Sequence, residues 1–200
     1  MSTESQRAPR SKRFWLAAAA VSVVVFAALL VAATTRSTSP PPSADGSRSV
    51  RFAGSAADGS GQVGERLGGF SLVSIDGEQV NAPADTPGVV FFMAGWCGSC
   101  LPEAAALEQI RDRFGDRVSV LAVSSDPTDS EAALREFRVA AGDAGYSFAW
   151  DREGALARRL AVSALDTTLV YDAGGKVVFR DAGPTDAATL QAALRKAGLA

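Results

Sequence analysis

Histidine is absent from this 200-residue chain, and cysteine occurs only twice. The absence of histidine excludes Ser-His and Cys-His catalytic arrangements and any metal site built on imidazole. Two cysteines cannot alone complete a four-ligand zinc site, and they are too few for a disulfide-dense scaffold. Charge of either sign is not in excess, with 20 basic and 22 acidic residues, so we expect no nucleic-acid partner.

The first 62 residues divide into three segments of different composition. Residues 1–13 form a basic tail with four Lys or Arg side chains and one acid, and residues 14–33 form an uncharged, largely apolar run. Such a run has the length of about 20 residues that a transmembrane helix needs, and the basic tail is expected on its cytoplasmic side. Residues 34–62 are rich in Ser, Pro and Gly, which is typical of a flexible linker.

These segments predict a single-pass protein of the bacterial plasma membrane, anchored by an uncleaved helix, with residues 63–200 on the extracytoplasmic side. The alternative is a cleaved signal peptide and a secreted domain. Either reading places the larger part of the chain outside the cytoplasm.

Residues 63–200 predict one α/β domain. Short apolar runs at 88–94 and 117–126 indicate buried strands, and helical periodicity follows each of them, at 99–115 and 128–145. The right-handed crossover rule makes these two strands parallel. The remaining elements are hairpins turning at Asp76-Gly77 and Gly174-Gly175, a strand at 146–150, a short helix at 153–162 and a last helix at 185–198. The pattern predicts a central mixed sheet flanked by helices.

Helix starts are indicated by two threonines. Thr128 and Glu131 have the spacing of a capping box, and Thr185 precedes the last helix. We therefore expect both threonines to act as N-caps.

Both cysteines lie in the stretch MAGWCGSCLPE, residues 93–103, where a buried strand gives way to a helix. At a helix N-terminus the unpaired backbone N–H groups and the macrodipole favour an anion, which lowers the pKa of a thiol placed there. Cys100 lies one helical turn beyond Cys97, close enough to form a disulfide with it. We predict that Cys97 attacks a substrate disulfide and that Cys100 resolves the mixed disulfide.

Two other readings of the cysteine pair are weaker. A metal site needs two further ligands, and carboxylates rarely supply them beside thiolates, so we expect no metal and no cofactor. A purely structural disulfide that closes so short a loop contributes little stability. Redox exchange is the favoured reading.

The stretch FFMAGWCGSCLPE resembles the active-site segment of the thioredoxin superfamily, and more closely that of its membrane-tethered TlpA/ResA branch. Residues 63–82 resemble the extra N-terminal hairpin of that branch, and residues 124–160 resemble its central helical insertion. The resemblance implies a thioredoxin-like fold with a four- or five-stranded sheet. It also implies dithiol–disulfide exchange with exported proteins, often reductive and often in cytochrome c maturation, and a membrane thiol donor or acceptor that resets the pair.

Further site residues follow from the resemblance. Asp166 stands where the family places a cis-proline beside the disulfide, flanked by Leu165 and Thr167, which we expect to contact substrate through their backbone. Because a cis bond before a non-proline residue is costly, we expect a trans bond at Asp166. Its carboxylate near the sulfurs would raise the pKa of Cys97; the alternative is that Asp166 turns outward and caps the loop.

Two residues beside the pair have both a site role and a structural alternative. Trp96 offers a contact surface for partner proteins, or else packs over the helix start. Glu103 matches an acidic residue that the branch carries near the disulfide. It would exchange a proton with Cys100, or else is an exposed acid that stabilises the first helical turn.

The predicted function is an extracytoplasmic thiol–disulfide oxidoreductase, acting as a reductase, although the same chemistry run backward makes an oxidase. One alternative is a redox-inactive thioredoxin-like docking module, which the substitution at Asp166 supports. Another is a Sco-type copper-handling protein, because residues 120–137 resemble its strand, loop and helix. That second function needs a histidine ligand, which this chain lacks.

Overall fold

A computed structural model describes residues 49–54 and 59–200 of the chain. The predicted basic tail, the predicted transmembrane segment at 14–33 and the larger part of the predicted linker lie outside these residues. Within the described ranges, none of the helices is long and apolar enough to cross a membrane.

The core of the domain is a five-stranded mixed sheet with the strand order β6-β5-β4-β7-β8. Strands β4, β5 and β6 are parallel, β7 runs antiparallel to β4, and β8 runs antiparallel to β7. This confirms the predicted mixed sheet and its parallel first pair. The strands are β4 (Gly88–Met93), β5 (Ser119–Ser124), β6 (Ser147–Trp150), β7 (Thr167–Tyr171) and β8 (Val177–Ala182).

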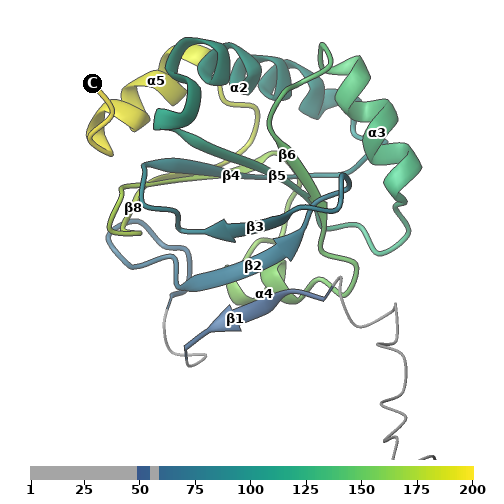
Figure 1. Cartoon of the computed structure of the whole chain (residues 1–200), viewed down its shortest axis with the longest axis horizontal. Helices are drawn as coiled ribbons and strands as arrows, with labels where there is room; N and C mark the ends of the chain where they lie inside the picture. The colour runs from purple at the N-terminus through teal and green to yellow at the C-terminus, as the bar shows by residue number, and fades with distance from the viewer. Residues whose placement is uncertain (1–48, 55–58) are drawn as a thin grey trace, which may run out of the picture. The chain divides into compact units, whose positions relative to one another are not determined.

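Helices cover both faces of this sheet (Figure 1). Helices α2, α3 and α5 lie on one face, and α4 lies on the other beside a second, smaller sheet. The four helices predicted between residues 99 and 198 are all present, with shorter bounds. They are α2 (Leu101–Phe114), α3 (Glu131–Ala140), α4 (Ala155–Arg159) and α5 (Ala187–Lys196), with 3-10 turns η1 (Gly98–Cys100) and η2 (Gly115–Arg117) at the two ends of α2.

The second sheet contains the predicted N-terminal hairpin and one further strand. The hairpin is formed by β2 (Gly69–Val73) and β3 (Gln79–Ala82), and β1 (Arg51–Ala53) pairs antiparallel with β2. The sequence predicts residues 51–53 as part of the linker, because that segment lacks any sustained apolar periodicity. Their pairing depends instead on partners distant in sequence, since Phe52 lies opposite Phe70 and its ring lies 4.4 Å from the guanidinium of Arg159.

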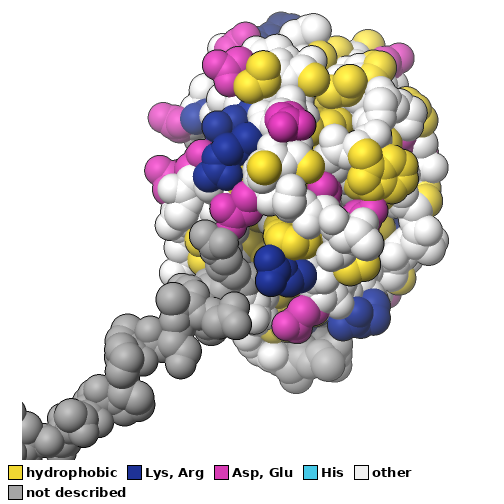
Figure 2. Space-filling model, turned by 90° about the vertical axis from the view of Figure 1, so that its right-hand side faces the viewer, with side chains coloured by type: hydrophobic (Ala, Val, Ile, Leu, Met, Phe, Trp, Pro, Cys, Tyr) yellow, Lys and Arg dark blue, Asp and Glu magenta, His cyan; other side chains and the backbone are white. Residues whose placement is uncertain are grey.

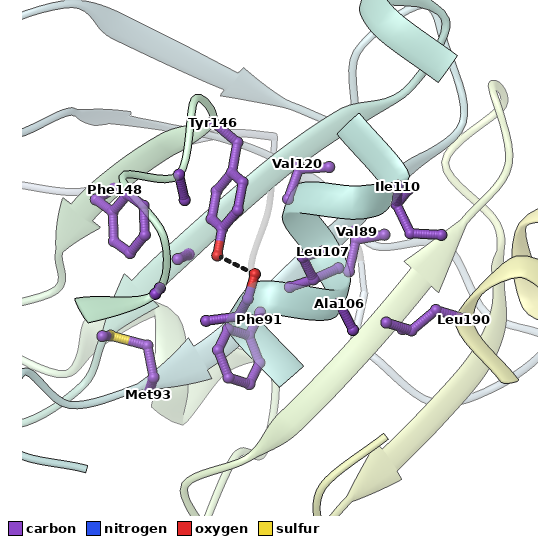
Figure 3. Close-up of a cluster of buried hydrophobic side chains, with 14 of the residues drawn as sticks. Val89, Phe91, Met93, Ala106, Leu107, Ile110, Val120, Tyr146, Phe148 and Leu190 are labelled. Carbon is purple, nitrogen blue, oxygen red and sulfur yellow. Dashed lines mark hydrogen bonds between the residues drawn. The ribbon is translucent and has the colours of Figure 1, made fainter. Parts of the chain in front are cut away.

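Strand β4 is buried on both faces, which explains its uninterrupted apolar sequence. Successive side chains point to opposite sides, so Phe91 packs with α2 and α5, whereas Phe92 packs with α4 and the second sheet. Figure 3 shows the first of these two cores, in which Leu107 and Ile110 of α2 face the strands. There the Tyr146 hydroxyl donates a hydrogen bond to the Ala104 carbonyl oxygen, 3.0 Å away.

Both predicted N-caps are wrong by one or two residues. Ser130 caps α3 by accepting from the Ala133 N–H, and Asp186 caps α5 by accepting from the Thr189 N–H. Thr128 instead donates its hydroxyl hydrogen to Asp126, in the turn before the helix. The backbone N–H of Thr185 is held by the Glu103 carboxylate of another helix, a tertiary contact that local sequence does not reveal.

Candidate active site

The cysteine pair lies at the carboxyl end of the central strand. Strand β4 ends at Met93, and Cys97 is the N-cap residue of η1, which runs directly into α2. The structure joins Cys97 to Cys100 through a disulfide with an S–S distance of 1.99 Å and a Cα–Cα distance of 5.4 Å. The predicted position of the pair at the start of a helix is therefore what the fold produces.

The two sulfur-bearing side chains differ in access. Cys97 is 4% exposed and Cys100 is fully buried. The residue with the greater exposure is the one predicted to attack, and the fully buried residue is the one predicted to resolve the mixed disulfide.

The loop before Cys97 is fixed by a buried aspartate from the turn that follows β5. One Asp129 carboxylate oxygen accepts hydrogen bonds from the Gly95 N–H at 2.7 Å and from the Ser124 hydroxyl at 2.6 Å. A Cβ atom at Gly95 would lie 2.7 Å from the other oxygen of Asp129. Glycine is required there because the two loops approach so closely.

Trp96 is exposed beside the disulfide, with 67% of its surface open to solvent. Its indole N–H donates to the carboxylate of Asp126 at 2.6 Å. The pKa of Asp126 is lowered by the backbone N–H and the hydroxyl of Thr128 and then by this indole N–H. The ring is thus held in place by a hydrogen bond at its edge and is not covered by the fold. Figure 2 shows one face of the molecule, where hydrophobic side chains lie in small groups among charged and polar ones.

Glu103 is buried, with 1% exposure, which shows the exposed-acid reading to be wrong. It lies three residues after Cys100, one helical turn further along. Its carboxylate accepts from the hydroxyl of Thr168 and from the backbone N–H of Thr185 at 2.9 Å. Burial raises the pKa of Glu103 to about 7, although both hydrogen bonds lower it. The group can therefore release or accept a proton near neutral pH.

Asp166 points into the site, so the outward-turning alternative is wrong. It is 6% exposed, and one carboxylate oxygen accepts from the Ser99 hydroxyl at 3.2 Å. The other oxygen is buried without a hydrogen-bond partner. Burial raises the pKa of Asp166, against the lowering effect of Ser99. Across the described residues the one cis peptide bond is Ala82–Pro83, so the bond before Asp166 is trans, as expected.

Leu165 and Thr167 lie on either side of Asp166 with little side-chain surface to offer. Leu165 is half-buried against the core on the α2 side. Thr167 is 1% exposed, and its hydroxyl donates to the Ala164 carbonyl oxygen at 2.7 Å. Because little of either side chain is exposed, the predicted contacts of Leu165 and Thr167 with substrate are expected to involve their backbone atoms.

Ser99 makes a contact at the site that the sequence does not predict. Its hydroxyl donates to the Asp166 carboxylate at 3.2 Å, and the same oxygen lies 3.4 Å from the Cys97 sulfur. A serine inside the CxxC motif was visible in the sequence, but its partner is 67 residues away along the chain. Thr168 and Thr185 were missed for the same reason.

Two buried carboxyl groups accompany the pair and are placed differently. Asp166 accepts a hydrogen bond from Ser99, whose hydroxyl oxygen lies beside the Cys97 sulfur, and Glu103 follows Cys100 on α2. Carboxylates near a sulfur disfavour its thiolate form and so raise its pKa. The cysteine sulfurs and an Asp166 oxygen also lie within 4.8 Å of one another, which makes them a set of possible metal ligands.

The cysteine pair lies at the start of a helix, directly after the central strand of a five-stranded mixed sheet, and a buried acid follows it on that helix. These features define a thioredoxin-like thiol–disulfide oxidoreductase. The comparisons with known proteins agree with this class. A family model described as the AhpC/TSA family matches residues 63–180, which is more than half of the chain. The chain belongs to this family, and its assignment to the TlpA/ResA-like part of the thioredoxin superfamily is confirmed.

Two relatives illustrate the similarity. The chain is 32% identical over 131 residues to the mercury resistance operon ORF3 protein of Streptomyces lividans, with 64% of this chain and 69% of that protein covered. It is 34% identical over 100 residues to a DsbE homologue, a thiol:disulfide interchange protein, of Paracoccus denitrificans. That match covers 49% of this chain and about half, 52%, of the DsbE homologue.

Solved structures share the fold at lower identity. A putative DsbE from Chlorobium tepidum has a TM-score of 0.60 and 23% identity, covering 68% of this chain and 97% of that one. A secreted disulfide oxidoreductase of Mycobacterium tuberculosis, homologous to E. coli DsbE, has a TM-score of 0.55 and 20% identity. The match covers 64% of this chain and 95% of the M. tuberculosis chain.

Proposed function

We propose that this oxidoreductase acts outside the cytoplasm as a reductase of disulfides in exported proteins, including apocytochromes c. The observation that carries the direction of the reaction is the buried Asp166 carboxyl group beside the cysteine pair. The proposal further assigns Cys97, Cys100 and Glu103 to catalysis and Trp96, Leu165, Asp166 and Thr167 to substrate contact.

The reductive cycle begins from the dithiol. The Cys97 thiolate attacks one sulfur of the substrate disulfide, forms a mixed disulfide and releases the other substrate sulfur as a thiolate, which takes up a proton. Glu103 then accepts the Cys100 proton, and Cys100 attacks the Cys97 sulfur. The second substrate sulfur leaves as a thiolate and takes up a proton, and the pair is oxidised to the disulfide seen in the structure. A membrane thiol donor supplies two electrons and two protons to restore the dithiol.

The direction of electron flow follows from the stability of the thiolate. A pair whose reduced form is stabilised as a thiolate is a strong oxidant, at about −120 mV, whereas thioredoxin has a potential of about −270 mV. Asp166 destabilises the Cys97 thiolate, because a negative charge nearby raises the free energy of that thiolate. We therefore expect a low, reducing potential.

The extracytoplasmic location rests on the sequence of residues 14–33 and on the secreted M. tuberculosis protein that shares the fold. The exposed Trp96 supports a partner that is a protein, since an exposed aromatic ring beside the reactive sulfur suits a peptide surface.

The decisive experiment measures the reduction potential of the pair in wild type and in Asp166→Asn. The full chain is equilibrated in thiol buffers of graded potential, and the state of Cys97 and Cys100 is read by alkylation and mass. Wild type is expected near −270 mV. The variant is expected to be less reducing by about 30 mV for each unit by which the Cys97 pKa falls.

Asp112→Asn serves as the matched control, because Asp112 is exposed on the far part of α2 and its removal leaves the site unchanged. A wild-type value near about −120 mV would show an oxidase and overturn the reductive direction. A pair that never equilibrates, even with strong reductant, would instead establish a redox-inactive docking module.

A further inference from the structure

Three buried side chains from two parts of the chain bring metal-binding atoms together. Cys97 and Cys100 offer their sulfur atoms from the start of α2, and Asp166 offers a carboxylate oxygen from the loop before β7. These atoms lie within 4.8 Å of one another, and this is the one such cluster found among residues 49–54 and 59–200. Ligands of one tetrahedral zinc ion with bonds of about 2.0–2.3 Å are separated by roughly 3.7 Å, so modest side-chain rotations suffice.

Asp166 has an oxygen available for a ligand. Oδ2 of Asp166 accepts a hydrogen bond from the Ser99 hydroxyl, whereas Oδ1 is buried and has no hydrogen-bond partner. A buried polar atom without a partner is uncommon in folded proteins and calls for an explanation. A cation bound beside the sulfurs would satisfy it.

We propose that the reduced protein binds one thiophilic divalent cation of the zinc, cadmium and mercury group through Cys97, Cys100 and Asp166. Thiolate ligands select soft and borderline cations, and a carboxylate completes the charge balance. The sequence disfavours a metal because the chain has no histidine and no third cysteine, and carboxylates rarely replace them. The fold brings one such carboxylate, Asp166, to the cysteine pair. Three protein ligands leave a fourth position open for water or for a substrate sulfur.

Binding is controlled by the redox state of the pair. In the oxidised protein the two sulfurs are bonded to each other and are not available as thiolates. In the dithiol, metal binding replaces two thiol protons, so two S–H bonds break, two metal–sulfur bonds form, two protons are released and no electron is transferred. The loaded protein therefore cannot attack a disulfide. This inhibition rests on the proposed function, but the binding itself does not.

The test titrates the fully reduced full-length chain with Cd²⁺ in the absence of oxygen. Binding is read from the ultraviolet sulfur-to-cadmium charge-transfer band, and affinity comes from competition with a chelator. We expect one equivalent to saturate the reduced protein, two protons to be released, and the oxidised protein not to bind. Asp166→Asn should bind at least about 10- to 100-fold more weakly, since losses of that size follow even from changes outside the ligand set.

Matched variants separate ligation from general effects. Asp112→Asn removes an exposed carboxylate from α2 and should keep wild-type affinity. Asp166→Cys replaces the oxygen donor by a third thiolate and should strengthen the charge-transfer band. Circular dichroism of each variant verifies that it is folded.

Two results would overturn the proposal. One is a reduced wild type that does not bind Cd²⁺ at one equivalent. The other is equal affinity in wild type, Asp166→Asn and Asp112→Asn with no band change in Asp166→Cys, which would mean that the cysteine pair binds alone. No substrate or electron donor enters this titration, so its outcome is independent of the measured reduction potential.

Discussion

Glu103 and Asp166 are both buried acids near the cysteine pair, but they are held differently. Glu103 accepts hydrogen bonds on both oxygens, from Thr168 and Thr185. Asp166 has one such bond, from Ser99. Both oxygens of Glu103 accept hydrogen bonds, and burial raises its pKa, whereas one oxygen of Asp166 has no hydrogen-bond partner.

The raised pKa of Glu103 predicts a pH dependence of stability. The native protein keeps the Glu103 proton up to a pKa of about 7, while the ordinary value is 4.5. Between these values the folded state binds more protons than the unfolded state, so the free energy of unfolding falls as pH rises. The loss amounts to about 3 kcal/mol between pH 4.5 and pH 8.

Urea denaturation of the oxidised protein at several pH values checks this expectation. Glu103→Gln should remove that part of the slope, whereas Glu136→Gln, at an exposed position on α3, should leave it as in wild type. An unchanged slope in Glu103→Gln would mean that Glu103 titrates at its ordinary pKa.

At the scale of elements, the loop between β4 and η1 is positioned by the loop between β5 and α3. Gly95 and Asp129 are the point of contact, because the Gly95 N–H and the Ser124 hydroxyl share one Asp129 oxygen. Parallel neighbouring strands place these two loops at the same edge of the sheet. The position of Cys97 thus depends on a residue of the next loop.

Gly95→Ala should destabilise the protein by about 1–3 kcal/mol, because the added Cβ would lie 2.7 Å from an Asp129 oxygen and 3.0 Å from the Ala133 Cβ. It should also slow alkylation of reduced Cys97, as the loop moves away from its anchor. Gly98→Ala is the matched control for stability, since a Cβ there meets nothing within 4 Å. Urea denaturation of both variants makes the comparison, and equal stability would contradict the close contact.

Sequence periodicity located the helices but not their first residues. For α3 the capping-box spacing favoured Thr128, yet Ser130 has the extended backbone and the side-chain bond of an N-cap. Both residues are of capping type, and what distinguishes them is that Thr128 is engaged by Asp126 in the preceding turn. Local patterns of this kind are matched by more than one position, and the three-dimensional turn selects between them.

On the scale of the whole molecule, the central sheet separates two hydrophobic cores. One lies between the sheet and helices α2, α3 and α5, and the other lies between the sheet and α4 with the second sheet. Strand β4 contributes alternate side chains to both, so neither core can be lost without exposing the same strand. We expect the described domain to unfold in one cooperative transition.

Truncations in the two cores should therefore add. Ile110→Val on the α2 side should cost about 0.5–1.5 kcal/mol, and Leu156→Ala on the α4 side about 2–5 kcal/mol. The double variant should equal the sum within about 0.5 kcal/mol, because the two side chains lie in different clusters. Denaturation curves of the three variants give the values, and a larger deviation or two separate transitions would contradict a single unit with independent cores.

Within residues 63–200 the sequence by itself determined the order and type of the main elements and the place of the cysteine pair. Apolar runs, helical spacing and turn residues act over a few neighbouring positions, so they can be read from the chain alone. It also predicted a reactive pair at Cys97 and Cys100, since both belong to one short segment at the start of α2.

Only the tertiary structure determined which side chains surround the cysteine pair. It buried Glu103, turned Asp166 inward and placed Ser99 between Asp166 and Cys97. It also paired residues 51–53 with β2, although their composition resembles a linker. Each of these outcomes depends on contacts between residues far apart in the chain. A pattern of neighbouring residues does not determine which distant side chain packs against them.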